Sequence, residues 1–278
     1  MLQPVGERSR QAKVWFLCFC WSVVLCVAVL LANLFISELK PNHAWGMAYG
    51  IAAAVLLCLV AAWAVRRRIM GFASRFHFGT SRSWLYLHIY GGLLFLLLML
   101  MHSGFRIPQG PLTLSLWILS IWTVASGILG LVFQKWIPRV LASGLSTEVL
   151  YDRIPSLIAE LRTRAEDLAR RSEEPVQNFY AKNLQESFQK PRRHFIYFWD
   201  ITGGIKARLQ RFEYLRGFLS ADGFLALDEL EDLYRTKLEL DAHFTLQQPL
   251  RWWLLAHVPT SWVLLVFVVV HIFTVIYY

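Results

Sequence analysis

Five long apolar segments constrain the fold of this 278-residue chain more than any other feature of its sequence. At a rise of about 1.5 Å per residue, a helix of about 20 residues crosses the roughly 30 Å hydrocarbon layer of a membrane. A helix also satisfies its own backbone hydrogen bonds, which lipid cannot do. The sequence therefore predicts an all-α integral membrane bundle of five transmembrane helices, at about residues 14–36, 45–65, 84–104, 113–134 and 252–277.

The other large part of the chain is a polar region between the fourth and fifth apolar segments. Residues 135–250 carry 17 Lys and Arg against 17 Asp and Glu. Apolar residues at helical spacing predict helices over 146–171, which Pro155 interrupts or restarts, and over 224–246. We therefore divide the chain into transmembrane helices 1 to 4, a helical insertion and transmembrane helix 5, at residues 1–134, 135–250 and 251–278.

The distribution of basic residues predicts how the chain is oriented. Arg8, Arg10 and Lys13 precede the first span, and five arginines follow the second, whereas the links after spans one and three carry one Lys and one Arg. By the positive-inside rule, the N-terminus and residues 135–250 are cytoplasmic, with the spans in the inner (cytoplasmic) membrane. The net charge of +9 therefore gathers at the ends of spans, which argues against a nucleic-acid partner.

Two spans carry the same motif, Arg-x-Trp-Leu-x-x-His, and in each a second histidine follows 14 positions after the first. Fourteen residues make nearly four helical turns, so both histidines of a span lie on about the same face, roughly 21 Å apart. Ionisable groups at membrane depth are costly and usually functional. The motif therefore marks His88, His102, His257 and His271 as candidate functional residues.

The predicted orientation makes these two spans parallel. His88 then lies level with His257 near the inner face (the inner pair), and His102 lies level with His271 near the outer face (the outer pair). A planar heme takes one axial imidazole from each of two helices, whereas a tetrahedral zinc site needs ligands that converge on one ion. The chain has no Cys-x-x-Cys-His motif for covalent attachment of heme. We therefore predict two non-covalent b-type hemes, one ligated at each level.

Further residues near the histidines are candidate heme contacts. Arg82 and Arg251 precede the inner histidines by six residues, and Arg106 follows His102 by four, which suits them to bind heme propionates. Anchoring at the membrane surface explains these arginines equally well. Gly91 and Gly92 leave room for a macrocycle beside His88, although close packing of helices would also use them.

Pro259 complicates the inner pair because it follows His257 by two residues. Proline lacks the N–H that would bond the carbonyl of Leu255, so we expect a kink in the last span. The hydroxyls of Thr260 and Ser261 can satisfy carbonyls in this turn. Whether the inner pair forms depends on how the helix accommodates the proline.

Three shorter stretches of the insertion also carry signals. Residues 193–199 combine basic and aromatic side chains, which predicts a short strand or an amphipathic piece that lies on the membrane surface. The pair Gly203-Gly204 predicts a turn, and Asp222 is a candidate helix cap.

The paired His-x13-His helices resemble those of membrane di-heme cytochromes b, and most of all the core of cytochrome b from quinol–cytochrome c oxidoreductases. The resemblance implies that His88 and His257 ligate one heme, and that His102 and His271 ligate the other. It covers only the two ligand helices. The chain has no Pro-Glu-Trp-Tyr motif, and the insertion separates the ligand helices, so the quinone sites of that family are not carried over.

These features together predict a di-heme b-type cytochrome that acts as the electron-transfer subunit of an oxidoreductase complex. Electrons would cross the membrane between a quinone or quinol and a partner subunit, such as a c-type cytochrome, an iron–sulfur protein or a flavin protein. The insertion has no cysteine and no Gly-x-Gly-x-x-Gly motif for a further redox cofactor. The alternatives are a non-redox membrane anchor or scaffold, and a pigment-binding membrane protein.

Overall fold

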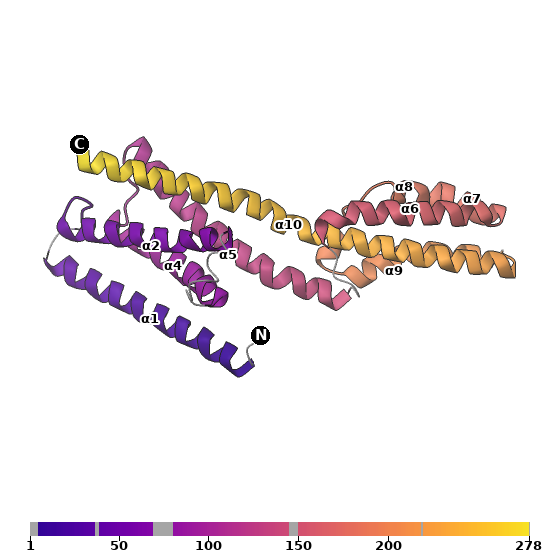
Figure 1. The fold of residues 1–278 in the computed structure, drawn as a ribbon, viewed down its shortest axis with the longest axis horizontal. Coiled ribbons are helices and arrows are strands. Elements are labelled where there is room, and N and C mark those ends of the chain that lie inside the picture. Colours follow the sequence, from indigo (N-terminus) through magenta and orange to yellow (C-terminus); the bar gives the residue numbers. More distant parts are fainter. Residues whose placement is uncertain (1–4, 37–38, 69–79, 145–149, 218, 278) are drawn as a thin grey trace. The chain divides into compact units, whose positions relative to one another are not determined.

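The computed structural model describes residues 5–36, 39–68, 80–144, 150–217 and 219–277. Across these ranges the chain forms helices and no strand, which confirms the all-α prediction (Figure 1). Five of the helices described are long and apolar enough to cross a membrane, so the chain is a multi-pass membrane protein in contact with lipid. They are α1 (Val5–Ile36), α2 (Ala44–Arg68), α4 (Ser81–His102), α5 (Pro111–Gly144) and α10 (Ala221–Tyr277). The link at 69–79, which contains one of the five arginines used to predict orientation (Arg75), lies outside the described ranges.

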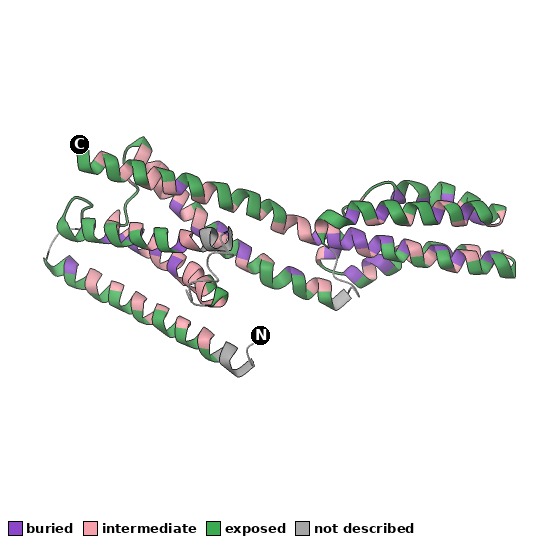
Figure 2. Ribbon diagram, viewed as in Figure 1, coloured by how far each residue is buried: buried purple, intermediate pink, exposed green. Residues whose placement is uncertain are grey.

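The chain forms two compact units, which we describe separately. The first comprises Met1–Leu129 and Ala256–Tyr278. In it, α4 packs along α2, and its tyrosines Tyr86 and Tyr90 meet Trp15 and Phe19 of α1, with ring centroids 6.3 and 5.2 Å apart. The large apolar side chains that face outward from α1 are exposed, as expected for a lipid-facing helix (Figure 2).

The second unit, Gly130–Leu255, holds the insertion and the ends of two long helices. Its core forms where Leu227, Leu230 and Tyr234 of α10 pack with Phe188 and Phe212. The predicted helix over 224–246 is confirmed as part of α10. The helix predicted over 146–171 starts at Ile154, with Pro155 in its first turn, and residues 146–149 lie outside the described ranges. The smaller elements are η1 (Tyr151–Arg153), α6 (Ile154–Arg171), α7 (Glu174–Phe179), η2 (Tyr180–Leu184), α8 (Gln185–Phe188), η3 (Phe195–Phe198) and α9 (Ile201–Arg216).

Helix α10 is a single helix of 57 residues. It runs without interruption through Pro249 and Pro259, so no break in secondary structure separates residues 135–250 from 251–278. Within the second unit, α10 approaches α5 closely at Gly130, where a Cβ atom would lie 2.1 Å from the ring of Trp253. Only a glycine leaves room for this indole. The N-terminal end of α10 is capped by Ser220, whose Oγ accepts from the N–H of Gly223, rather than by Asp222.

The predicted turn at Gly203-Gly204 is wrong, because both glycines lie in the first turn of α9. Asp200 caps this helix, and its Oδ1 accepts a hydrogen bond from the N–H of Gly203 at 2.7 Å. A Cβ on Gly204 would lie 3.0 Å from Ile196 and 3.1 Å from the Tyr197 ring. Gly204 therefore lets η3 pack tightly on α9, and neither glycine reverses the chain.

A buried ion pair attaches the segment before η3 to α10. Lys237 and Asp241 are both fully buried, and Lys237 Nζ donates to Asp241 Oδ2 at 2.5 Å. Asp241 Oδ1 also accepts from the backbone N–H of Arg192 at 2.9 Å. Burial raises the pKa of Asp241 and lowers that of Lys237. The pair therefore depends on mutual compensation of two desolvated charges.

His194 lies beside this ion pair, and its lowered pKa should make the stability of the protein depend on pH. Burial, and then the positive charges of Arg208, Lys237 and Arg192, lower the pKa of His194 to about 4. Arg208 Nη2 donates to His194 Nδ1 at 3.0 Å, which requires a neutral ring. As the pH falls from about 6.5 to 4, the unfolded chain binds a proton that the folded chain does not, so about 3 kcal/mol of stability should be lost.

Thermal unfolding of the full chain in detergent at pH 7 and pH 5 measures the part of this loss that falls above pH 5, which is about 2 kcal/mol. The variant His194→Gln, which cannot take up a proton, should lose less stability over the same interval. Equal losses in the variant and the parent chain would rule out His194 as the source.

Candidate functional site

The four motif histidines come together as two pairs within the first unit. His88 and His102 lie on α4, and His257 and His271 lie on α10. The ring centroids of His88 and His257 are 6.4 Å apart, and those of His102 and His271 are also 6.4 Å apart. The two helices therefore run in parallel and present one imidazole pair at each of two levels, as the motif predicts.

The separation within each pair suits a planar macrocycle between the rings. A metal–imidazole bond is about 2 Å long, and the ring centroid lies about 1.1 Å behind the ligating nitrogen, so two axial imidazoles of one metal have centroids roughly 6.2 Å apart. Both pairs match this distance. In the described part of the chain, no three His, Cys, Asp or Glu side chains group together to hold a metal. A porphyrin brings four ligands of its own, so a pair of imidazoles would be enough to hold its metal.

Helix α2 orients both histidines of α4. His102 Nδ1 lies 2.8 Å from the carbonyl oxygen of Gly46, and His88 Nδ1 lies 3.3 Å from that of Val60. A carbonyl accepts only, so Nδ1 carries the proton and Nε2 keeps its lone pair. Gly46 and Val60 are 14 residues apart, which matches the spacing of the two histidines. The antiparallel α2 thus sets the same tautomer at both levels, as partners of metal-bound histidines commonly do.

Helix α5 orients the inner histidine of α10. Ser126 Oγ lies 2.8 Å from His257 Nδ1 and 3.0 Å from the carbonyl oxygen of Thr123. The hydroxyl donates its proton to that carbonyl, which leaves its oxygen to accept from His257 Nδ1–H. In three of the four imidazoles, the proton therefore lies on Nδ1 and the lone pair on Nε2.

A glycine lets one of these rings lie against backbone. A Cβ on Gly50 would lie 2.8 Å from His102 Nδ1, whereas a Cβ on Gly127 would make only an ordinary contact with His257 Cε1, at 3.5 Å. The sequence indicates Ser126 and Gly127 only as small residues for helix packing. Neither Gly46, Gly50 nor Val60 carries a sequence signal for this role, because two of them act through backbone carbonyls.

Pro259 does not turn His257 away from His88. Helix α10 continues through it, and the inner pair has the same centroid separation as the outer pair. Thr260 Oγ1 donates to the carbonyl of Ala256 at 2.8 Å, and Ser261 Oγ donates to that of His257 at 2.7 Å. These hydroxyls satisfy carbonyls in the turn around the proline, as the sequence predicts.

The three arginines predicted to contact heme lie in different surroundings, and one of them belongs to the second unit. Arg82 lies half-exposed in the first turn of α4, and Arg106 is exposed just after it. Arg251 belongs to the second unit, where its Nη1 binds Asp152 Oδ1 at 2.9 Å and its guanidinium lies 5.0 Å from the Tyr151 ring centroid.

The two glycines near His88, Gly91 and Gly92, differ in how closely other atoms approach them. A Cβ on Gly91 would lie 2.9 Å from Val60 Cγ2, so this glycine permits close packing of α4 on α2. Gly92 has no atom within 4 Å of where its Cβ would stand. It follows His88 by four residues and so shares its face. Gly92 is therefore the one of the two that borders open space beside the inner pair.

Comparison of the chain with protein-family models, curated proteins and solved structures gave no significant match.

Proposed function

We propose that the chain is a di-heme b-type cytochrome subunit that carries electrons across the membrane. The observation that supports this most is the repeated geometry of the two pairs. Each has one imidazole from α4 and one from α10, with ring centroids 6.4 Å apart. His88 and His257 would hold the inner heme, and His102 and His271 the outer heme. Heme iron would supply the one-electron redox chemistry that this function needs.

The protein contributes ligands, their orientation and an apolar surrounding. The carbonyls of Gly46 and Val60 fix the α4 imidazoles, and Ser126 fixes His257. Between the two levels, buried Phe95 of α4 and Leu264 of α10 belong to one apolar cluster. This packing keeps water from the space between the pairs and holds the two levels roughly 21 Å apart along the helices.

The route of electrons beyond the hemes follows from the proposed orientation. We place the chain in the cytoplasmic membrane, with its N-terminus and residues 135–250 in the cytoplasm. The chain would carry electrons between quinone or quinol and a redox partner protein. The chain itself acts as the electron-transfer subunit.

Absorption and electron paramagnetic resonance spectra of the purified protein test the heme proposal. We expect a dithionite-reduced b-type spectrum at two hemes per chain. The imidazole planes meet at 80° in the inner pair and 71° in the outer pair, so both oxidised hemes should give the strongly anisotropic low-spin signal of near-perpendicular ligands. A purified protein from heme-supplemented cells that shows no heme absorption would contradict the proposal.

A non-redox membrane anchor is the second candidate, and one observation favours it. A centroid separation of 6.4 Å with steeply inclined rings also lies within the range of direct edge-to-face contacts. In that case the imidazoles would pack against each other and join α4 to α10. The same spectrum separates the two functions, because an anchor binds no heme. A pigment-binding protein would show pigment absorption instead, and paired histidines do not favour it.

Replacing Ser126 with Ala tests the orientation of His257 directly. The variant removes the acceptor of His257 Nδ1–H, which should weaken binding of the inner heme about 10- to 100-fold and raise its reduction potential. Redox titration measures both effects, and Ser126→Thr should restore them in part. The matched control is Ser120→Ala, since this buried serine on the same helix bonds only the carbonyl of Leu116 among the contacts described. An unchanged inner heme in Ser126→Ala would contradict the assigned role.

A further inference from the structure

A cluster of exposed apolar side chains on the second unit has no role in the proposed electron transfer. Phe195 and Ile196 lie in the short helix η3 and Trp199 directly follows it; Phe195 and Trp199 are 74% and 83% exposed. The intervening Tyr197 points inward and is fully buried. We call Phe195, Ile196 and Trp199 the η3 cluster. Such large exposed apolar side chains mark a surface that contacts something other than water.

Packing within the second unit ties this cluster to the ends of two membrane-spanning segments. The ring of Phe198 stacks on Trp136 of α5, with centroids 5.9 Å apart and planes inclined by 11°. Trp136 follows the apolar run of α5 by two residues. Pro249 of α10, which lines the same pocket, precedes the last apolar run by three. The η3 cluster therefore lies at the level where α5 and α10 leave the hydrocarbon, which is where tryptophan gathers in membrane proteins.

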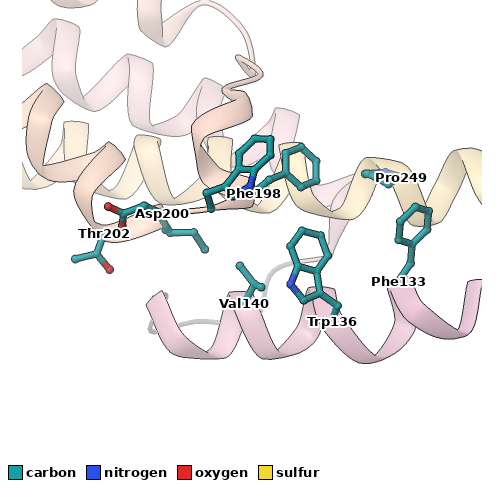
Figure 3. A pocket seen from close by; sticks show the side chains of 9 residues that line it. Phe133, Trp136, Val140, Phe198, Asp200, Thr202 and Pro249 are labelled. Carbon is teal, nitrogen blue, oxygen red and sulfur yellow. The ribbon is translucent and has the colours of Figure 1, made fainter. Parts of the chain in front are cut away.

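A pocket of about 830 Å³ opens beside the stacked rings (Figure 3). Phe133, Trp136 and Val140 of α5 form one wall, and Phe198 faces them from the other side. Asp200 and Thr202 lie at one end. The apolar wall continues the lipid-facing surface of α5, so the pocket offers an acyl chain a place next to the membrane.

The charges near the cluster are mainly basic. Lys135 and Arg139 are exposed on α5, and Lys190 and Arg193 are exposed just before η3. The nearest carboxylate, Asp200, is engaged in capping α9. Basic side chains combined with exposed aromatic rings bind the headgroups of anionic lipids.

We propose that the η3 cluster docks on the surface of the bilayer, with an anionic phospholipid held between the basic residues and the pocket. The aromatic rings enter the headgroup region, and one acyl chain lies along Phe133, Trp136 and Val140. This contact is independent of heme. It holds the second unit against the membrane that α5 and α10 cross.

Spin labels on the full chain in vesicles test this proposal. In a variant whose four native cysteines are replaced by Ala, a nitroxide is attached through Trp199→Cys. Two further sites are controls in the same unit. Trp252→Cys, 63% exposed, lies at the start of the last span, and Leu225→Cys, 68% exposed, lies 27 residues earlier, about 40 Å along α10. Collision of each label with oxygen and with a water-soluble nickel complex reports its depth.

In vesicles of phosphatidylethanolamine and phosphatidylglycerol, we expect the label at 199 to resemble that at 252. It should collide several-fold less often with the nickel complex than the label at 225. In phosphatidylcholine vesicles, this difference should shrink. A label at 199 as exposed to nickel as that at 225 overturns the docking, and an equal depth in both vesicles overturns the requirement for anionic lipid. Both results are separable from heme binding, which is read from absorption in the same samples.

Discussion

Replacing both His102 and His271 with Ala is expected to leave one heme per chain, because under the proposed function these two side chains hold the same heme. Each single variant should also hold one heme. In contrast, replacing His102 and His257 together should remove both hemes, since each site then loses one ligand. Loss of a ligand to iron is the largest functional effect that the proposed site predicts. Heme per chain, measured from the pyridine complex, distinguishes these combinations.

These double variants test whether His102 pairs with His271 and His88 with His257. If the His102/His271 variant holds no heme while it remains folded, the histidines do not pair as their ring centroids indicate. His43→Ala is the matched control. This exposed histidine lies just before α2 and belongs to neither pair, and its replacement should leave two hemes.

Replacing Lys237 with Met is expected to destabilise the second unit by about 3–5 kcal/mol, because it leaves the carboxylate of Asp241 buried without its counter-charge. Asp241 is fully buried, and the loss of Lys237 Nζ removes its closest donor. Part of the segment around Arg192 should loosen, since its N–H bonds the same carboxylate. Thermal unfolding of the full chain in detergent, followed by near-ultraviolet circular dichroism, measures the loss.

Two comparisons show whether burial causes this effect. The double variant Lys237→Met/Asp241→Asn removes both charges and keeps an acceptor for Arg192, so it should recover much of the stability. Arg164→Met breaks the exposed pair with Glu160, which has the same four-residue spacing, and should cost less than about 0.5 kcal/mol. Equal losses in the buried and exposed variants would refute the explanation.

The membrane helices and the histidine pairs could be predicted because their signals are carried by side chains along the sequence. Apolar runs located the spanning segments, although α5 continues ten residues past the predicted end at 134. The repeated 14-residue interval and the distribution of arginines predicted that His88 faces His257. Both depend on periodicity and charge, which are visible without a three-dimensional structure.

The groups that orient the histidines could not be predicted in the same way. Gly46 and Val60 act through backbone carbonyls, which any residue possesses, so their position on α2 is decided only when α2 packs against α4. Lys237 and Asp241 did leave a signal. They lie on the same helical face as Tyr234 and Leu238, and charges on an apolar face indicate a buried pair. The length of α10 was missed because Pro249 and Pro259 normally end or bend a helix.

The sequence separation within the histidine pairs has a consequence for assembly. Both pairs join residues 169 positions apart, with the entire insertion in between. Bringing such distant segments together carries a loop-closure entropy that local helix formation does not offset. A heme bound as proposed would act as a cross-link that closes this loop twice. Under this proposal, heme insertion would be a late step that holds α10 beside α4. Heme-free chains should then be degraded by proteases faster than heme-bound chains.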